Sequence, residues 1–395
     1  MTVEELTIQG PPEEPPPPDE PRRWSPRRRW VAVLGTIVVV GLVTAALLVK
    51  LPYYTLSPGS ARATEPLISV EGAPTYESDG NIDFLTVSLR HATPIDLLAA
   101  WINPAVDVKS EEELFPNQTP EENRQLNLQA MSQSKDAATY QALTRLGYDI
   151  PASGSGALVA APVEEGTPAC GVLGVGDVIT SVDGTPVALA SDLIETLAPV
   201  APGTEVSMEV TTLDLPAIAQ SDASAETQCP VDEREPGGSR TVDVALGARP
   251  EDPSRAYLGI ALQTNGLSFD FPVDVTIDSG RVGGPSAGLA FTLGLLDVMT
   301  PGSLTGGLSI ATTGTMELDG RVGPIGGIAQ KVEAAKREGV QLMLVPSSEI
   351  DEARRHADGL RVEPVEDLDD ALAVLATVGG GDAVLPAEPA SAQLP

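Results

Sequence analysis

Two short motifs carry the residues whose types and spacing could do chemistry. The first, GGPSAG, places Ser286 between a glycine-rich turn and an apolar stretch, and the second, PIGGIAQK, ends at Lys331. A serine hydroxyl becomes a good nucleophile once a neighbouring base removes its proton, and a desolvated lysine amine can be that base. The pair therefore predicts a Ser–Lys peptidase.

Ser286 precedes a run, AGLAFTLGLL, that is apolar on nearly every side. Such a pattern predicts a buried helix with Ser286 at its first turn, where unpaired N–H groups and the helix dipole favour negative charge. Backbone donors there could hold the oxyanion that forms on a substrate carbonyl, and we expect Gly284 and Ala287 to supply them. A plain helix-capping serine is the alternative interpretation.

Lys331 falls on the apolar stripe of a second predicted helix. Ile328, Val332 and Ala335 recur at i, i+4 and i+7, and Lys331 lies between the first two. Burial disfavours the charged amine, so the pKa of Lys331 should fall and the neutral form could accept the serine proton. The alternative is a lysine whose stem only covers apolar surface, and Lys336 also flanks the stripe.

The composition excludes several other functions. The chain has 395 residues, a net charge of −32, two histidines and two cysteines. Such an acidic chain without a basic stripe is not expected to bind nucleic acid. No Cys/His cluster has zinc-site spacing and no phosphate-binding loop is present, so we expect no metal and no cofactor. His91 and His356 are expected to be ordinary surface residues, not members of a catalytic triad.

The N-terminal region predicts a membrane anchor. Residues 1–29 are rich in Pro and Glu, which predicts a disordered cytoplasmic tail, and residues 30–50 contain the uncharged run WVAVLGTIVVVGLVTAALLV. At full helical length that run spans about 30 Å, enough for one transmembrane helix. The arginines before it predict a single-pass protein of the cell membrane with the rest of the chain extracytoplasmic. A cleaved signal peptide is the alternative, but the run is long and no small-x-small cleavage site follows.

Residues 51–150 show no chemistry and are interpreted as an extracytoplasmic scaffold segment. The stretch 81–89 alternates like a half-buried strand, and a polar helix is expected at about 120–146 after an N-cap at Thr119.

Residues 151–248 predict a small β domain. A strand at 157–160, a strand that ends in Asp183-Gly184, a helix at 190–197 and a strand at 202–210 follow in order. The pieces ALVAAPVEEGTPA, GVGDVITSVDGTPV, DLIETL and PGTEVSMEV resemble PDZ domains of bacterial proteases. The resemblance implies a β-barrel-like domain that captures peptides, with a ligand-carboxylate loop and adjoining strand at Gly154, Ser155, Gly156, Ala157 and Leu158. A flexible glycine linker is the alternative interpretation of that loop.

Within this domain, residues 213–240 are polar and aperiodic and are interpreted as an inserted loop. The loop contains Cys229, and Cys170 starts a short helix. Two cysteines in an exported domain make a disulfide between them plausible, although spacing alone gives no distance.

The segment from residue 249 to 378 is similar to the proteolytic domain of Lon peptidases. The pieces GPSAG, SIATTGTMELDGRVGPIGGIAQKVEAAKREG and LMLVP carry the resemblance. It implies that Ser286 is the nucleophile, Lys331 the general base and Thr313 a residue that orients the lysine. The chain departs from the family pattern at Gly283 and Thr315, and it lacks the ATPase module. Because Lon-type domains commonly form rings, the resemblance also implies a homo-oligomer, such as a hexameric ring.

Together these features predict an α+β multidomain protein: a transmembrane helix, a PDZ domain, a Lon-type proteolytic α/β domain and a disordered tail at 379–395. The predicted function is ATP-independent, membrane-anchored serine endopeptidase activity on protein or peptide substrates that the PDZ domain recruits or gates. The alternative is a catalytically inactive PDZ-containing scaffold at the membrane.

Overall fold

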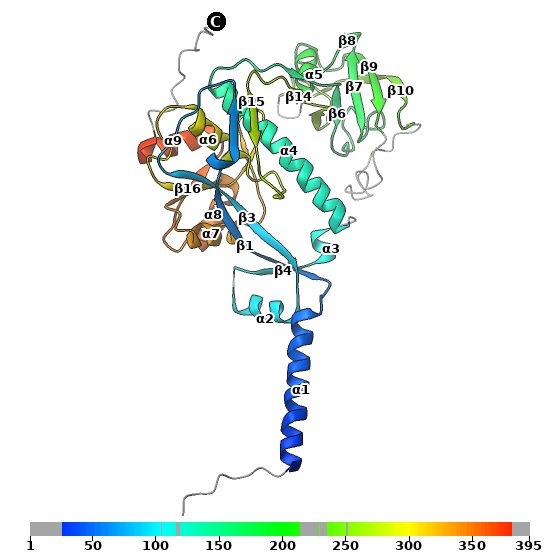
Figure 1. The fold of residues 1–395 in the computed structure, drawn as a ribbon. Helices are drawn as coiled ribbons and strands as arrows, with labels where there is room; N and C mark the ends of the chain where they lie inside the picture. The colour runs from blue at the N-terminus through cyan, green and yellow to red at the C-terminus, as the bar shows by residue number, and fades with distance from the viewer. Residues whose placement is uncertain are drawn as a thin grey trace, which may run out of the picture.

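A computed structural model describes residues 26–103, 105–115, 119–213, 229, 235–249 and 252–380. Most of the predicted tails at 1–29 and 379–395 and most of the predicted inserted loop at 213–240 lie outside these ranges. The described chain forms a body with a smaller β unit beside it and one long helix that projects from the opposite end (Figure 1).

The projecting helix, α1 (Pro26–Leu48), corrects the predicted anchor. Among the helices in these ranges, none has both the length and the apolar character that crossing a bilayer requires. Helix α1 ends at Leu48, two residues before the end of the predicted span 30–50, and its first turn contains the arginines at 27–29. The transmembrane part of the predicted fold class is therefore wrong, and so is the single-pass membrane localisation that depended on it.

The body is built on one six-stranded sheet with the order β20-β19-β16-β3-β1-β4. Its central strand β16 runs parallel to both neighbours, with Ile310 opposite Leu342 on one side and Ile82 on the other. Strands β1 and β4 complete the sheet in antiparallel pairing. The strand bounds are β1 (Tyr53–Ala63), β3 (Asn81–His91), β4 (Asp107–Ser110), β16 (Ser309–Thr312), β19 (Leu342–Pro346) and β20 (Arg361–Val365).

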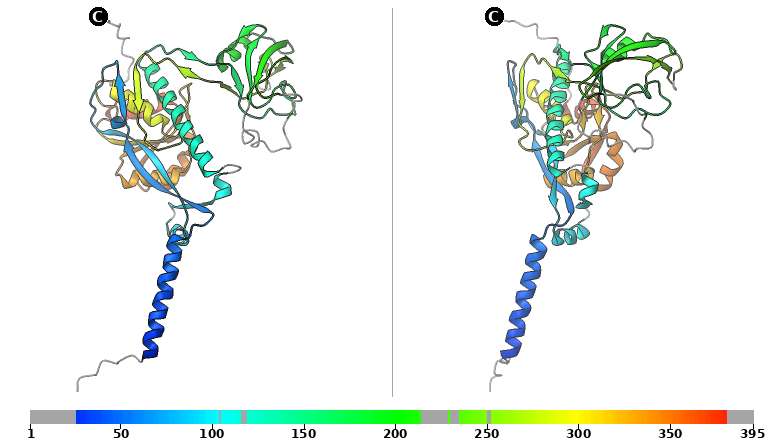
Figure 2. Two further views of the ribbon diagram at one scale, coloured as in Figure 1. Left: turned by 45° about the vertical axis from the view of Figure 1, so that its right-hand side comes forward. Right: turned by 90° about the vertical axis from the view of Figure 1, so that its right-hand side faces the viewer.

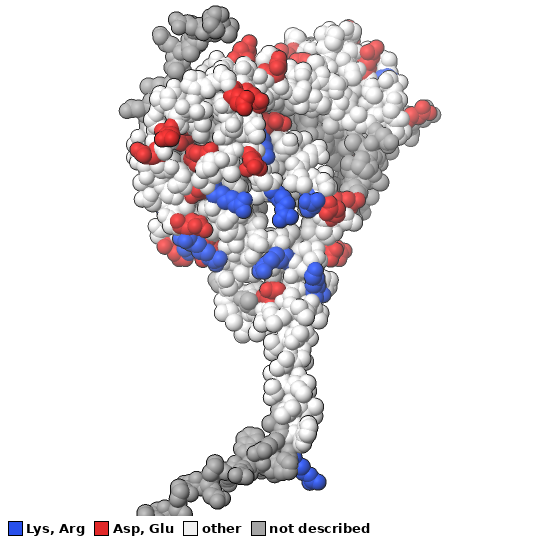
Figure 3. All heavy atoms as spheres, in the orientation of Figure 1, with Lys and Arg blue, Asp and Glu red and all other residues white. Residues whose placement is uncertain are grey.

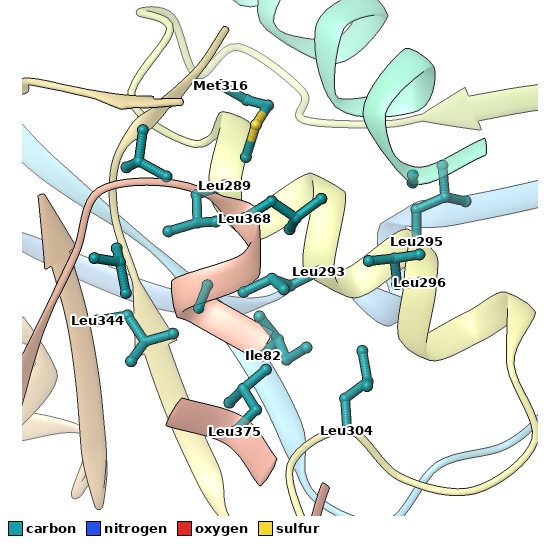
Figure 4. Packing of buried hydrophobic residues seen from close by; sticks show 14 of the residues in the cluster. Ile82, Leu289, Leu293, Leu295, Leu296, Leu304, Met316, Leu344, Leu368 and Leu375 are labelled. Carbon is teal, nitrogen blue, oxygen red and sulfur yellow. The ribbon is translucent and has the colours of Figure 1, made fainter. Parts of the chain in front are cut away.

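Helices cover both faces of this sheet, as the alternation of strand side chains requires. Leu342 and Leu344 of β19 face the core around helix α6 (Gly288–Met299) and α9 (Leu368–Leu375), shown in Figure 4. Met343 and Val345 face the opposite core. That core contains α7 (Ile328–Arg337) and α8 (Ile350–His356).

Helix α6 is buried along nearly its whole length, as its apolar sequence predicts. It packs against β3 and against α4 (Pro120–Arg145). Helix α4 opens with a capping box, in which the Thr119 hydroxyl accepts from the Glu122 amide and the Glu122 carboxylate accepts from the Thr119 amide. The shorter helices nearby are α2 (Pro94–Ile102), α3 (Glu111–Leu114) and the 3-10 turns η1 (Glu65–Leu67) and η3 (Ser347–Glu349); the π-helical turn η4 (Ala376–Gly380) follows α9.

The segment interpreted as a scaffold, 51–150, packs into the same body as the segment after residue 249. Strand β3 pairs with β16 in the central sheet, and α4 lies against α6. Pairing between residues more than two hundred positions apart depends on tertiary structure, so neither segment's own pattern could reveal it.

The smaller β unit interrupts that body between β5 (Ala152–Ser153) and β14 (Ser268–Phe269), which pair with each other. Figure 2 shows it to one side of the body. Its sheet has the order β10-β9-β7-β6-β13, and helix α5 (Ala190–Leu197) contacts β6 and β13. The strands are β6 (Ala157–Val159), β7 (Asp177–Val182), β8 (Thr185–Pro186), β9 (Glu205–Thr212), β10 (Ser239–Ala245) and β13 (Leu262–Thr264).

Short ladders tie the remaining loops together. Strand β2 (Ile68–Glu71) pairs with β15 (Asp274–Ile277), and β17 (Thr315–Met316) pairs with β18 (Val322–Gly323). Strand β11 (Gly247–Ala248) pairs with β12 (Ala256–Tyr257). In the sequence, the β17–β18 hairpin connects the end of β16 with the start of α7, the two elements that lead to Thr313 and Lys331.

Candidate active site

Ser286 lies in the turn that enters α6. Its glycine-rich approach is held by α4: the Gly284 amide donates to the Asn127 carbonyl at 2.7 Å, and the Ser134 hydroxyl donates to the Pro285 carbonyl at 2.9 Å. Gly284 has φ +91, a conformation that favours glycine. The residue at the cap position of α6 is Ala287, so the Ser286 side chain does not cap the helix.

The backbone of Ser286 is fixed from its other side by the residues after β16. Its carbonyl accepts from the Gly314 amide at 3.0 Å, and the Leu289 amide donates to the Gly314 carbonyl at 3.2 Å. Gly314 has φ +155, and a Cβ there would lie 2.4 Å from Cγ1 of Val322. Only glycine therefore fits at position 314, where the backbone hydrogen-bonds to the serine turn just after β16.

Lys331 reaches the serine from α7. The helix starts after Gly327, which has φ +71, and buries Ile328, Val332 and Ala335 as the sequence predicts. Lys331 is 2% exposed. Its Nζ lies 2.9 Å from Oγ of Ser286 and 3.0 Å from Oγ1 of Thr313. Within the described ranges no carboxylate forms an ion pair with this amine; Lys336, by contrast, pairs with Glu333 and Asp358 on the exposed side.

The threonine determines the direction of these hydrogen bonds. The Thr313 hydroxyl donates its only proton to the Ser286 carbonyl at 3.2 Å, so its oxygen can only accept from Lys331. A neutral amine that donates one N–H to Thr313 has its lone pair free for the serine proton. Thr313 is fully buried, which keeps this arrangement away from competing water.

Burial lowers the pKa of Lys331 from 10.5 to about 7, and the negative charge of Glu349 opposes part of this change. Near neutral pH a large fraction of the amine is therefore unprotonated, as a general base requires. Burial is the larger cause, which agrees with the position of Lys331 on the buried face of α7.

Glu349 is a residue that the sequence analysis missed. One of its oxygens accepts from the Ile325 amide at 2.8 Å, which holds the loop before α7, and the other is buried without a partner among the described residues. Burial raises the pKa of Glu349, partly offset by that hydrogen bond. Its serine-rich surroundings, PSSEI, give no local signal of such a role.

Of the two predicted oxyanion donors, only Ala287 is available. The Gly284 amide is already engaged by Asn127. In the described part of the chain, the amides of Ser286 and Ala287 donate to no acceptor, and both belong to the turn that carries the Ser286 side chain. Free amides at the start of a helix can donate to an anion.

Ser286 and Lys331, which together we call the dyad, line a cavity of about 910 Å³. Its walls come from the bulged part of β1, from β3, from Asn127 and Met131 of α4, and from the loops that carry Ser286 and Ile325. Phe84, Met131 and Ala287 are buried together in one apolar cluster that borders the serine.

The structure does not leave the predicted peptide loop of the β unit free. The Ser155 amide donates to the Asn265 carbonyl at 2.8 Å, and the Gly156 amide donates to the Ala188 carbonyl at 3.0 Å. Ala157 and Leu158 of β6 are paired on both sides, by β7 and by β13. Gly154 is also crowded, because a Cβ there would lie 2.4 Å from Thr264. An added strand needs a free edge, and the edge next to α5 is that of β13, not β6.

The two cysteines form a disulfide in the same unit; the Cys170 and Cys229 sulfurs are 2.03 Å apart, and the residues are 59 positions apart in the sequence. The bond ties Cys229 to the short turn at 169–171, next to the apolar core of the unit.

Comparison with known families defines the classes of the two units. Residues 268–377 match the family model of the Lon protease (S16) C-terminal proteolytic domain, and residues 131–212 match that of the PDZ domain. A Lon-type proteolytic domain and a PDZ domain are thus present in the chain, and they support a serine-type peptidase. The Lon-type match includes Ser286, Thr313 and Lys331.

The chain is similar to particular Lon proteases over this region. The Lon protease of Flavobacterium johnsoniae is 36% identical over 126 residues, which cover 30% of this chain and 15% of that protein. Lon protease 2 of Bacillus subtilis is 29% identical over 106 residues, covering 27% of this chain and 18% of that protein. The chain therefore spans less than a fifth of either relative. The crystal structure of the PDZ domain of the SdrC-like protein from Listeria monocytogenes covers 27% of this chain and 87% of its own, with 19% identity and a TM-score of 0.20.

Proposed function

We propose that this protein is a serine endopeptidase that cleaves extended polypeptide segments with a Ser286–Lys331 dyad. The observation that carries the proposal is the 2.9 Å approach of a buried lysine amine to the serine hydroxyl, without an ion-pair partner for the amine in the described chain.

In the first half of the reaction, Oγ of Ser286 forms a bond to the substrate carbonyl carbon while neutral Lys331 takes the hydroxyl proton. The carbonyl oxygen becomes an oxyanion, and the Ser286 and Ala287 amides are placed to donate to it. Collapse of this intermediate breaks the peptide C–N bond, and the protonated Lys331 returns its proton to the leaving amine. An acyl ester on Ser286 remains.

In the second half, water replaces the amine. Neutral Lys331 removes a proton from the water as its oxygen attacks the ester, and the same amides support the second oxyanion. The proton then returns to Oγ of Ser286, and the new carboxylic acid leaves. Thr313 is a positioning residue in both halves, because its hydroxyl keeps the amine lone pair directed at the serine. No step requires a nucleotide, so the proposal includes ATP-independent cleavage.

The PDZ domain is proposed to recruit or gate substrates. Strand β13 lies at the edge of its sheet beside α5, which is the geometry for adding a peptide strand. We also propose the domain division that the sheets suggest. A PDZ unit at about 152–264 is inserted in a proteolytic unit assembled from the segments on either side of it. The ring assembly implied by the resemblance remains a prediction, and mass photometry of the full chain tests it.

Cleavage of an unfolded protein by matched variants tests the proposal. Ser286→Ala and Lys331→Ala should abolish cleavage with circular dichroism unchanged, whereas Ser69→Ala, at an exposed serine of β2, should cleave like the wild type. Full activity in the Ser286→Ala protein would reject the nucleophile. If the wild type cleaves nothing but still binds peptides, the alternative holds, in which the chain is a PDZ-containing scaffold with an inactive proteolytic domain.

A further inference from the structure

The cavity in front of the dyad has an unusual charge for this chain. The whole sequence holds 56 acidic and 24 basic residues. Among the described residues that line the cavity, however, Arg62, Arg281 and Lys331 carry the only ionisable side chains of either sign, and none is acidic. Since burial brings the pKa of Lys331 to about 7, the fixed charge of the cavity comes from the two arginines.

The two arginines belong to different walls of the cavity. Arg62 lies on β1 opposite Phe84 of β3, just beyond the bulge between Pro58 and Ala61. Bulges beside active sites commonly redirect side chains. Arg281 begins the glycine-rich turn that ends at Ser286. A substrate segment that runs through the cavity therefore meets a guanidinium on the strand wall and another on the serine-turn wall.

Both guanidinium groups are free to meet a ligand. Arg62 and Arg281 are exposed, and within the described ranges neither side chain takes part in an ion pair or hydrogen bond. Other basic side chains in this acidic chain do find carboxylates, such as Arg145 with Asp369 and Arg321 with Asp319. Figure 3 shows Lys and Arg gathered at mid-height on one face of the body, over the region of β1, β3 and α4, with Asp and Glu mainly above and beside them.

We propose that Arg62 and Arg281 select substrates that carry acidic residues beside the cleaved bond. This inference rests on the proposed peptidase function and names the substrate class of the same site. An acidic segment is attracted to the cavity by the two arginines, whereas the acidic remainder of the protein repels it from other surfaces. A segment with lysines at the same positions meets like charge at the cavity.

The experiment uses the full chain and short peptides with a common apolar centre, acetylated and amidated so that termini carry no charge. One peptide has Asp on both flanks of the centre and the other has Lys. We expect the wild type to cleave the Asp peptide with a kcat/KM about tenfold higher, since each exposed charge pair contributes up to about fivefold. The ratio should fall toward one in about 0.5 M NaCl.

Arg62→Glu combined with Arg281→Glu should reverse the preference in favour of the Lys peptide. The matched control, Arg354→Glu with Arg355→Glu, changes two exposed arginines of α8 outside the cavity and should keep the wild-type preference. Equal cleavage of both peptides by the wild type would overturn the inference, and so would an unchanged preference in the double Arg62/Arg281 variant. If that variant does not fold, Arg62→Gln and Arg281→Gln must each reduce the ratio by at least about twofold.

Binding separates this inference from the proposed function. Fluorescence anisotropy with Ser286→Ala protein needs no catalysis, and it should show tighter binding of the labelled Asp peptide than of the Lys peptide. A wild type that binds with this preference but does not cleave would reject the peptidase while keeping the acidic-segment site. A protein that cleaves both peptides equally would reject the site while keeping the peptidase.

Discussion

Replacement of Lys331 by methionine should abolish activity and stabilise the protein at the same time. Methionine keeps the length and apolar stem of lysine but has no amine, so the general base is lost and cleavage should fall at least about 10⁴-fold. The stability gain follows from burial. The gap between a pKa of 10.5 and one of about 7 corresponds to about 5 kcal/mol between the charged and neutral forms.

The sign follows from proton binding. The folded-state pKa of Lys331 is lowered, so between about pH 7 and pH 10.5 the unfolded chain binds more protons at this residue, and the free energy of unfolding rises with pH. Below about pH 7, Lys331 is protonated in both the folded and the unfolded state, so the full cost of burying the charged amine remains. This cost lowers the free energy of unfolding by about 4 kcal/mol at pH 7 and by about 2 kcal/mol at pH 9.

Methionine removes this cost but also two hydrogen bonds, to Ser286 and Thr313, of about 1 kcal/mol each. The variant should therefore be about 2 kcal/mol more stable than the wild type at pH 7 and about equal to it at pH 9. Denaturant-dependent hydrogen exchange of peptides from α6 and β16 measures unfolding of the proteolytic unit at each pH. The activity of the wild type should decrease on the acid side with an apparent pKa of about 7, as Lys331 becomes protonated.

The matched control is Lys336→Met on the same helix. Lys336 is ion-paired on the surface with Glu333 and Asp358, so its replacement should leave activity intact and change stability by less than about 1 kcal/mol at both pH values. A Lys331→Met protein several kcal/mol less stable than the wild type at pH 7 would show instead that the buried site accommodates a charged lysine well.

Other substitutions test the supporting parts of the site and fold. Thr313→Val should lower kcat by about 10- to 100-fold, and Thr313→Ser should restore most of it; equal activity in both would deny the threonine a positioning role. Gly314→Ala should destabilise the proteolytic unit by about 2–3 kcal/mol, measured by urea unfolding, and a neutral effect would contradict the close contact with Val322. Glu349→Gln keeps an acceptor for the Ile325 amide but removes a negative charge near Lys331, so the acid limb of activity should move to lower pH by up to about one unit; movement to higher pH would be the wrong sign. Cys170→Ser should lower the stability of the PDZ unit by about 4 kcal/mol, and dithiothreitol should do the same to the wild type but not to the variant.

Local patterns in the sequence predicted the helices that carry the dyad. The apolar run after Ser286 and the stripe around Lys331 depend on periodicity within about one helix, and burial then follows from where each apolar face can pack. The helix at 190–197 was predicted with the bounds that α5 has, for the same reason.

Long-range pairings could not be read in this way. Nothing local shows that β3 lies beside β16, or that the edge of the PDZ sheet is formed by β13, about a hundred positions after β6. Nor does any local pattern show that β13 pairs with the strand next to the predicted peptide loop at 154–158. The roles of Asn127 and Ser134 could not be predicted for the same reason. Both residues contact the serine turn from α4, a helix that carries no chemical motif.

Labelling by a fluorophosphonate probe, with the modified residue identified by mass spectrometry, tests whether the Lys331 amine activates Ser286. A Ser286–Lys331 dyad predicts a single adduct on Ser286 in the wild type, formed faster as the pH rises through about 7, and none in Lys331→Met. Equal labelling of Ser286 with and without the lysine amine, or an adduct on another serine in a protein that still cleaves peptides, would contradict it.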